Sequence, residues 1–151
     1  MSFLLLCDEK LFFRVAAILI IPVLVCGDQL AAFVIKPWVA RLRPCHALEN
    51  VRLLVNCGGK YSFPSNHATN IAGFAMLFTL IYRKYWYWFW GVAVTISFSR
   101  IYVGVHYPLD VVGGMILGSL IGLFIFYLYK FLAMKYPHLN YYMKPEKVVK
   151  N

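Results

Sequence analysis

Long apolar runs separated by short polar segments dominate the sequence. Four runs, at about residues 11–35, 66–82, 85–100 and 108–130, are apolar enough to be membrane-spanning helices. A span needs roughly 20 such residues, because a helix rises about 1.5 Å per residue through a hydrocarbon core about 30 Å thick. The pattern predicts an all-α fold, a polytopic membrane helix bundle with about four transmembrane helices. We expect one domain over residues 1–151.

Composition agrees with this prediction and excludes other classes. Hydrophobic residues make up 62% of the chain and charged residues 14%, whereas a soluble domain is about half apolar and about a quarter charged. A disordered chain is excluded because it would need low hydrophobicity. The net charge of +9 indicates cytoplasmic loops and lipid headgroups. We therefore expect contact with the lipid bilayer and no nucleic acid partner.

The distribution of charge orients the four spans. Four spans put both termini on one side of the membrane, and the loop 36–65 and the connection 100–107 on the other. The terminal side carries nine Lys and Arg residues and the loop side six, so the positive-inside rule predicts cytoplasmic termini. The loop 36–65 then faces outward, and its cations are candidates to bind an anion. The basic tail 131–151 is expected at the membrane surface.

Residue types at the span ends carry further signals. The third run opens with the aromatic segment YWYWFW, which is typical of a membrane–water interface, and Pro108 is favoured in the first turn of the fourth. Glycines in the fourth run have spacings that permit close helix packing. They are Gly113, Gly114, Gly118 and Gly122. The outward loop holds Cys45 and Cys57, for which a disulfide and two free thiols are both open.

Three polar clusters fall at span ends that the predicted topology brings to one membrane face. The first runs from Lys36 to Pro44. Lys36 and Arg43 are seven positions apart, so on a helix both cations would lie on one face and bind a single anion. Taken alone, this cluster is better explained by cations that extend from a helix end toward water.

The second cluster, Phe63 to His67, precedes the second span. Ser65 is a natural N-cap there. A helix N-terminus binds anions through its free N–H groups and its dipole. Ser65 and the Asn66 amide are therefore candidates to hold phosphate oxygens, with His67 beside them.

The third cluster joins the last two spans and contains Arg100, His106 and Asp110. His106 precedes Asp110 by four residues, so the carboxylate can accept a hydrogen bond from one ring nitrogen and make the other a stronger nucleophile or base. Together the clusters contain the groups needed to hold a phosphate, attack it and protonate what leaves.

These motifs resemble the type 2 phosphatidic acid phosphatase (PAP2) superfamily. Its signatures are a Lys separated by six residues from Arg-Pro, then Pro-Ser-Gly-His, then Ser-Arg, five residues, His, three residues and Asp. The chain matches in order and spacing at Lys36, Arg43-Pro44, Pro64-Ser65, His67, Ser99-Arg100, His106 and Asp110. Asn66 departs, because the family usually has Gly there, and we expect this to affect substrate shape rather than chemistry. Membrane members commonly have six spans, so elements that gate or widen a lipid entrance are expected to be missing.

The resemblance implies a membrane lipid phosphatase with a PAP2/haloperoxidase-like core. It implies hydrolysis of a phosphate or pyrophosphate monoester of an envelope lipid without metal or another cofactor. His106 is the expected nucleophile, which forms a phosphohistidine, Asp110 orients it, and His67 protonates the leaving group before it activates water. The residues expected to bind the phosphate are Lys36, Arg43, Ser65, Asn66 and Arg100.

Resemblance to short bacterial members favours the inner membrane of a bacterium, with the site facing the periplasm or the exterior. The sequence does not rank a lipid A-type glycolipid, undecaprenyl pyrophosphate, phosphatidylglycerophosphate and phosphatidate as substrates, and it gives no oligomeric state.

Three alternatives stay open. A non-enzymatic membrane scaffold or transporter subunit would not need His106 and Asp110 together. Vanadate-dependent haloperoxidases share the motif pattern, but they are soluble and larger. A metal site built from His46, His67, His106 and the loop cysteines matches no zinc spacing.

Overall fold

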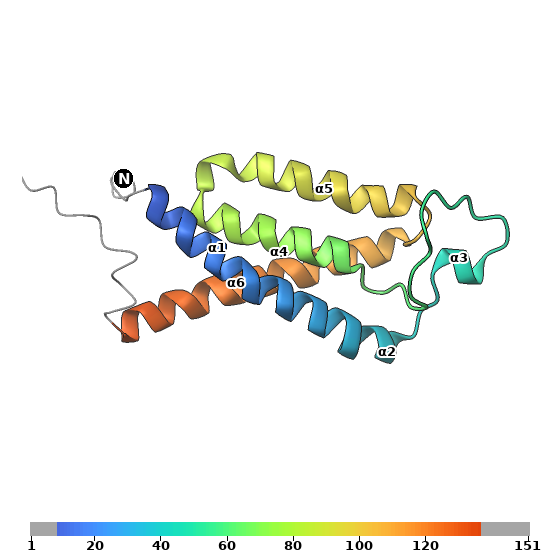
Figure 1. Ribbon diagram of the computed structural model, residues 1–151, viewed down its shortest axis with the longest axis horizontal. Helices are drawn as coiled ribbons and strands as arrows, with labels where there is room; N and C mark the ends of the chain where they lie inside the picture. The colour runs from blue at the N-terminus through green and yellow to red at the C-terminus, as the bar shows by residue number, and fades with distance from the viewer. Residues whose placement is uncertain (1–8, 137–151) are drawn as a thin grey trace, which may run out of the picture.

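Four long helical segments form the molecule, and the computed structural model describes them over residues 9–136, with side chains from residue 15 onward (Figure 1). The first segment is continuous through three elements: α1 (Glu9–Gln29), the π-helix η1 (Leu30–Ile35) and α2 (Lys36–Val39). The others are α4 (Asn66–Ile81), α5 (Trp86–Tyr102) and α6 (Pro108–Lys135). The short helices α3 (Pro44–Ala47) and η2 (Arg83–Tyr85) lie in the connections. The predicted all-α bundle is confirmed.

The helix boundaries differ from the predicted ones mainly at their ends. The first segment continues beyond residue 35 to Val39 and stops where Ala40 adopts a left-handed φ of 50°, so the loop begins at residue 40 and not at 36. Helix α6 starts at Pro108 as predicted but extends to Lys135, because residues 131–135 continue its helix-compatible pattern. The rest of the predicted tail, from residue 137, lies outside the described residues.

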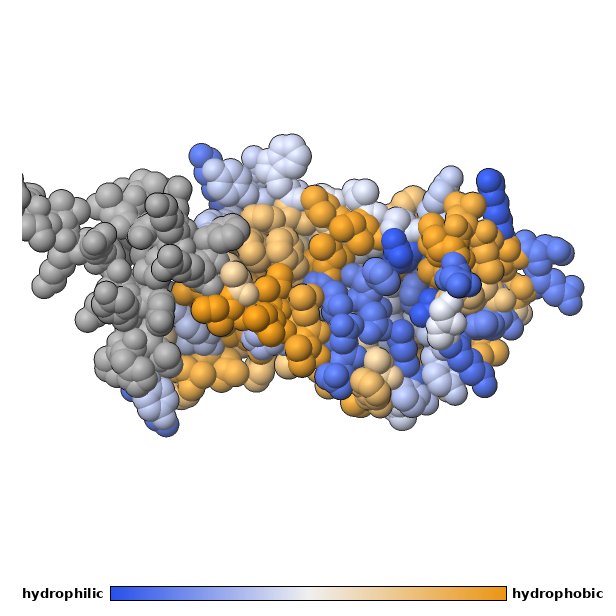
Figure 2. Space-filling model, viewed as in Figure 1, coloured by the Kyte–Doolittle hydropathy of each residue, from blue (hydrophilic) through white to orange (hydrophobic). Residues whose placement is uncertain are grey.

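Polar residues gather toward the loop end of the bundle, where the loop also exposes apolar side chains such as Leu48 and Leu54. Figure 1 shows the start of α1 and the end of α6 at one end of the bundle, and the loop with α3 and the α5–α6 connection at the other. Figure 2 shows hydrophilic residues gathered toward the loop end and hydrophobic ones along the adjoining helices. Three polar clusters that are far apart in the sequence thus reach one end of the bundle.

Apolar side chains both fill the bundle and cover its outside. The buried cluster consists of Val15, Leu19, Val23, Leu77, Ile121 and Ile125. Large apolar residues are also exposed, for example Phe33 at 73% and Phe124 at 64%, as lipid-facing side chains would be. Two stretches, Val15–Val39 and Pro108–Lys135, are long and apolar enough to cross a membrane. Helices α4 and α5 have 16 and 17 residues, and their role as spans stays a prediction.

A row of glycines lets α6 pack directly on α4. A Cβ atom at Gly114 would lie 2.6 Å from the Ser65 carbonyl oxygen, and one at Gly122 would lie 2.7 Å from that of Gly73. At Gly118 a Cβ atom would overlap the Thr69 carbonyl oxygen. These backbones can approach only because α6 carries no side chain at those positions.

We expect Gly118→Ala to lower the free energy of unfolding in detergent by about 1–3 kcal/mol, because the new methyl group forces α6 away from α4. Gly91→Ala on α5 is the matched control, since a Cβ atom there would have no neighbouring atom of residues 9–136 within 4 Å. It should be neutral or should stabilise the helix by up to about 1 kcal/mol. Equal effects of the two substitutions on the unfolding midpoint would contradict the close packing.

Candidate active site

Two arms of the loop pair and place the arginines of the first cluster. Ser62 N–H donates to the Arg41 carbonyl oxygen at 2.8 Å, and Arg43 N–H donates to the Lys60 carbonyl oxygen at 3.2 Å. One prediction is wrong here: Lys36 and Arg43 do not share a helix. Arg43 has an extended backbone, with φ −68° and ψ 154°, since the helix has already ended at Val39. The loop, not helical spacing, brings the two cations close enough to interact electrostatically.

A disulfide closes the same loop. Cys45 and Cys57 are joined, with their Cα atoms 6.3 Å apart, which is one of the two arrangements left open by the sequence. His46 lies beside the pair, and within the described part of the chain the ligand atoms close enough to share an ion there come from these three residues. The alternative metal site that joins the cysteines to His67 and His106 is therefore not formed by the described residues. The oxidised sulfurs, in addition, are not thiolate ligands.

A backbone hydrogen bond joins the second and third clusters. Ser65 N–H donates to the Asp110 carbonyl oxygen at 3.0 Å, so the first turns of α4 and α6 are held together. Ser65 occupies the N-cap position of α4, as predicted, but its hydroxyl does not cap the helix. Its Oγ is buried and has no hydrogen-bond partner among the described residues. The hydroxyl is thus available to a ligand atom at this junction.

His106 and Asp110 are neighbours, as their spacing predicts. His106 Nδ1 lies 3.5 Å from Asp110 Oδ2, a long contact of the kind that often tightens when substrate binds. His106 is 4% exposed and Asp110 is 0% exposed. Gly104 turns the chain just before His106 with φ 79°, and a Cβ atom there would lie 2.8 Å from the Arg52 carbonyl oxygen. Only glycine fits this turn.

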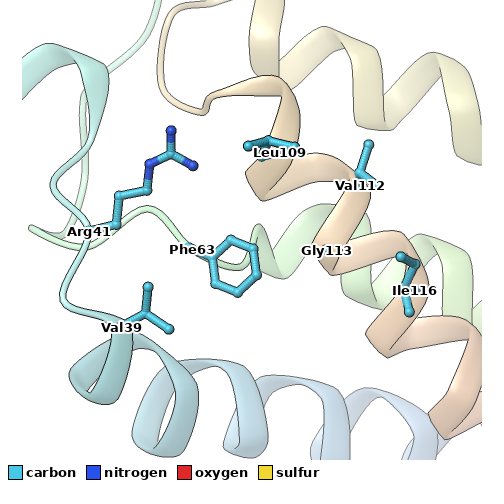
Figure 3. A pocket seen from close by; sticks show the side chains of 7 residues that line it. All are labelled: Val39, Arg41, Phe63, Leu109, Val112, Gly113 and Ile116. Carbon is cyan, nitrogen blue, oxygen red and sulfur yellow. The ribbon is translucent and has the colours of Figure 1, made fainter.

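Arg41 contacts Asp110, a contact that the sequence did not predict. Arg41 Nη1 donates to Asp110 Oδ1 at 3.1 Å, and Tyr107 N–H donates to Asp110 Oδ2 at 2.8 Å. The Arg41 guanidinium also lies over the Tyr107 ring, 4.1 Å from its centroid. Figure 3 shows Arg41 reaching from the loop toward the first turn of α6. These bonds fix the carboxylate that faces His106. A position inside a loop carries no periodicity, so no sequence pattern marked Arg41 for this role.

Electrostatic interactions connect the remaining candidate residues. His67 is exposed, and the charges of Arg100, His106 and Arg43 act on it. Arg43 and Lys36 act in turn on His106. Arg100 Nε donates to Ser99 Oγ at 3.2 Å. The two imidazoles and the three cations therefore lie in one electrostatic neighbourhood.

Burial lowers the pKa of the His106 imidazole below its ordinary value of 6.5. Asp110 opposes this by favouring the protonated ring, while the positive charges of Arg43 and Lys36 add to the lowering of the pKa. The net direction keeps His106 neutral near pH 7, so that one ring nitrogen has a free lone pair.

Two cavities adjoin this region. One, of about 480 Å³, has a polar end and an apolar wall. Its polar lining is Asp28, Asn66, His67 and Asn70, and its apolar lining is Ile20, Leu24, Ile71, Phe74 and Ile96. The other, of about 430 Å³, lies between the end of α2 and the start of α6 and has Arg41 as its charged lining residue (Figure 3). The first cavity contains His67, so it is the one that the candidate chemistry reaches.

The PAP2 superfamily model matches residues 13–133. The chain belongs to this superfamily. It is 35% identical over 127 residues to a lipid A 4′-phosphatase of Porphyromonas gingivalis, covering 80% of this chain and 53% of that relative. It is 43% identical over 83 residues to an undecaprenyl-diphosphatase of Sulfolobus acidocaldarius, covering 54% of this chain and 40% of that relative. The chain thus spans about half the length, or less, of these curated relatives.

A solved structure shares the fold. A transmembrane PAP2-type phosphatidylglycerolphosphate phosphatase from Bacillus subtilis superposes with a TM-score of 0.56 at 24% identity. The match covers 85% of this chain and 71% of that one. The PAP2 membrane phosphatase fold, predicted from the motifs and spans, is confirmed.

In this PAP2 chain, Arg41→Met should lower the free energy of unfolding by about 1–3 kcal/mol, because it leaves the buried Asp110 carboxylate without its charged partner. Arg52→Met removes the same charge from an exposed position in the same loop and should change stability by no more than about 0.5 kcal/mol. Denaturation midpoints in detergent measure both. Equal losses would mean that the Arg41–Asp110 pair contributes nothing specific.

Proposed function

We propose that the protein is a membrane lipid phosphatase that hydrolyses a phosphate or pyrophosphate monoester of an envelope lipid through a phosphohistidine, without metal. The observation that carries the proposal is the meeting of His67, the His106–Asp110 pair and three cations at one end of the bundle. Beside them lies a cavity with a polar end and an apolar wall, which suits an amphiphile. The relatives in the family are named for lipid phosphate substrates.

Phosphate binding is assigned to cations and to unpaired polar groups. Lys36, Arg43 and Arg100 would neutralise the phosphate oxygens, most strongly in the transition state. Arg43 Nε and Ser65 Oγ are buried and find no hydrogen-bond partner in the described part of the chain, and a phosphate oxygen would satisfy each of them. The Asn66 backbone N–H at the start of α4 adds a donor. The three cations would supply the positive charge that a metal would otherwise provide.

In the first step, His106 Nε2 attacks phosphorus. Nδ1 keeps its proton and donates a hydrogen bond to Asp110, which leaves the Nε2 lone pair free and stabilises the positive charge that develops on the ring. The bond between phosphorus and the leaving oxygen breaks, and His67 donates a proton to that oxygen. The products are a phosphohistidine and the dephosphorylated lipid.

In the second step, water attacks the phosphohistidine. His67, now neutral, accepts a proton from the water, and the bond between phosphorus and Nε2 breaks. Inorganic phosphate leaves, and both histidines return to their starting protonation states.

The proposal includes an orientation in the membrane. With more cations on the terminal side than on the loop side, the termini would be cytoplasmic, and the site would face the periplasm or the exterior of a bacterial inner membrane. The substrate would then be a lipid of the outer leaflet.

Replacing His106 by Ala should reduce phosphate release from purified lipid phosphates by about 10³-fold or more, because the nucleophile is lost. His46→Ala changes an exposed histidine of the loop and should leave the rate unchanged. Acid-labile, base-stable labelling from a ³²P-phosphorylated lipid should appear with the wild type and be absent from the His106 variant. Retained turnover in that variant, or loss of wild-type turnover in a chelator, would contradict the mechanism.

The pH profile should report His106. The attacking ring must be neutral, and burial lowers its pKa below the ordinary 6.5. We therefore expect kcat/KM to stay constant as the pH is lowered to 6.5 and to decrease only at lower pH, where the ring becomes protonated. Asp110→Asn removes a group that raises the His106 pKa, so the acid limb should move to lower pH while the maximal rate falls by about 10²-fold or more. An acid limb that stays in place, or that moves to higher pH, would argue against His106 as the titrating base.

A further inference from the structure

A carboxylate in the first apolar run has no part in the proposed chemistry. Asp28 lies near the end of α1 and lines the cavity that contains His67. An ionisable side chain within a membrane-spanning segment is costly and usually marks a functional site. In the sequence, Asp28 interrupts the first apolar run, residues 11–35.

Two amides hold Asp28 in place. Its Oδ1 accepts hydrogen bonds from Asn66 Nδ2 at 2.9 Å and from Asn70 Nδ2 at 3.1 Å. The two asparagines are four residues apart on α4 and so lie on one face of that helix. Gly27 lets α1 come close, since a Cβ atom there would lie 2.8 Å from Asn70 Oδ1. The carboxylate is therefore fixed at the polar end of the cavity.

The second carboxylate oxygen has no partner within the described residues. None of their donors bonds to Asp28 Oδ2, and none of their Lys, Arg or His nitrogens lies within 4.0 Å of the carboxylate. Asp28 is exposed. An ionised carboxylate only accepts hydrogen bonds, so the polar end of this cavity offers an anionic acceptor next to His67.

We propose that Asp28 is a specificity residue that accepts a hydrogen bond from a hydroxyl or amino group of the leaving group. The preferred substrate is then a lipid phosphate whose phosphorylated sugar or glycerol unit carries such a donor. This inference rests on the proposed function, in which His67 protonates the leaving group and so marks its side of the site.

The same carboxylate disfavours a different substrate class. In a prenyl diphosphate the leaving group is a second phosphate, which has no donor when ionised and is repelled by Asp28. Asn66 stands where the family motif has Gly, and its side chain supplies one of the two bonds that fix Asp28. The departure from the motif is thus part of the specificity device.

The test compares two substrates that differ by one hydroxyl group: 1-acyl-glycerol 3-phosphate and its 2-deoxy analogue. The wild type should prefer the hydroxylated lipid by about tenfold or more in kcat/KM, since a hydrogen bond to a charged group is lost with the analogue. In Asp28→Asn, the amides of Asn66 and Asn70 occupy the new carbonyl oxygen, and an N–H₂ group faces the cavity. The ratio of kcat/KM for the hydroxylated lipid to kcat/KM for its 2-deoxy analogue should fall to near one, and the rate of hydrolysis of undecaprenyl diphosphate should rise several-fold.

Two further variants sharpen the result. Glu49→Gln removes one negative charge from an exposed position in the outward loop and should keep the wild-type preference. Asn66→Gly leaves Asp28 with one amide partner and should reduce the preference, even if Asp28→Asn folds poorly. The inference would be overturned if Asp28→Asn or Asn66→Gly is active and shows the same preference for the hydroxylated lipid as the wild type. A wild type that releases phosphate from none of these three lipids, and from neither a lipid A-type glycolipid nor phosphatidylglycerophosphate, would instead overturn the proposed function.

Discussion

The direct contact between the first turns of α4 and α6 is the constraint on which the site depends. The Ser65 N–H to Asp110 carbonyl bond of 3.0 Å ties the helix that carries His67 to the helix that carries Asp110. This bond can form because Gly114 brings the two backbones together, with room for no Cβ atom near the Ser65 carbonyl oxygen. The glycine row continues this contact along α6 through Gly118 and Gly122. Helix packing and the geometry of the candidate site thus depend on the same interface.

The residues around this junction differ in burial and in charge. Asp110 is fully buried and is held by Arg41 and Tyr107, so it can orient His106 without moving. His67 is exposed and borders the amphipathic cavity, where, in our proposal, it meets the leaving group. In our proposal the cations bind the transferred phosphate, and Asp28 accepts a hydrogen bond from the leaving group. The opposite charges would then face opposite parts of one substrate.

The sequence predicted what depends on periodicity and local spacing. Apolar runs located four helical segments, Pro108 marked the start of α6, and the spacing of four residues between His106 and Asp110 predicted their contact. The sequence did not predict where the first helical segment ends, nor the contacts between residues that are far apart along the chain. The helix that carries Lys36 ends at Ala40, which has a left-handed backbone. Alanine is not a residue that predicts such a turn. The partnership of Arg41 with Asp110 spans 69 positions, and that of Asp28 with Asn66 spans 38. Neither distance leaves a local pattern.

A structure of the protein with orthovanadate, which mimics phosphorus in the transition state, would show whether the two histidines and the three cations form one phosphate site. We expect vanadium bonded to His106 Nε2, its equatorial oxygens bound by Lys36, Arg43 and Arg100, and its far apical oxygen facing His67 and the cavity. Vanadate bound elsewhere, or His67 and His106 unable to reach the same vanadium atom, would contradict this expectation.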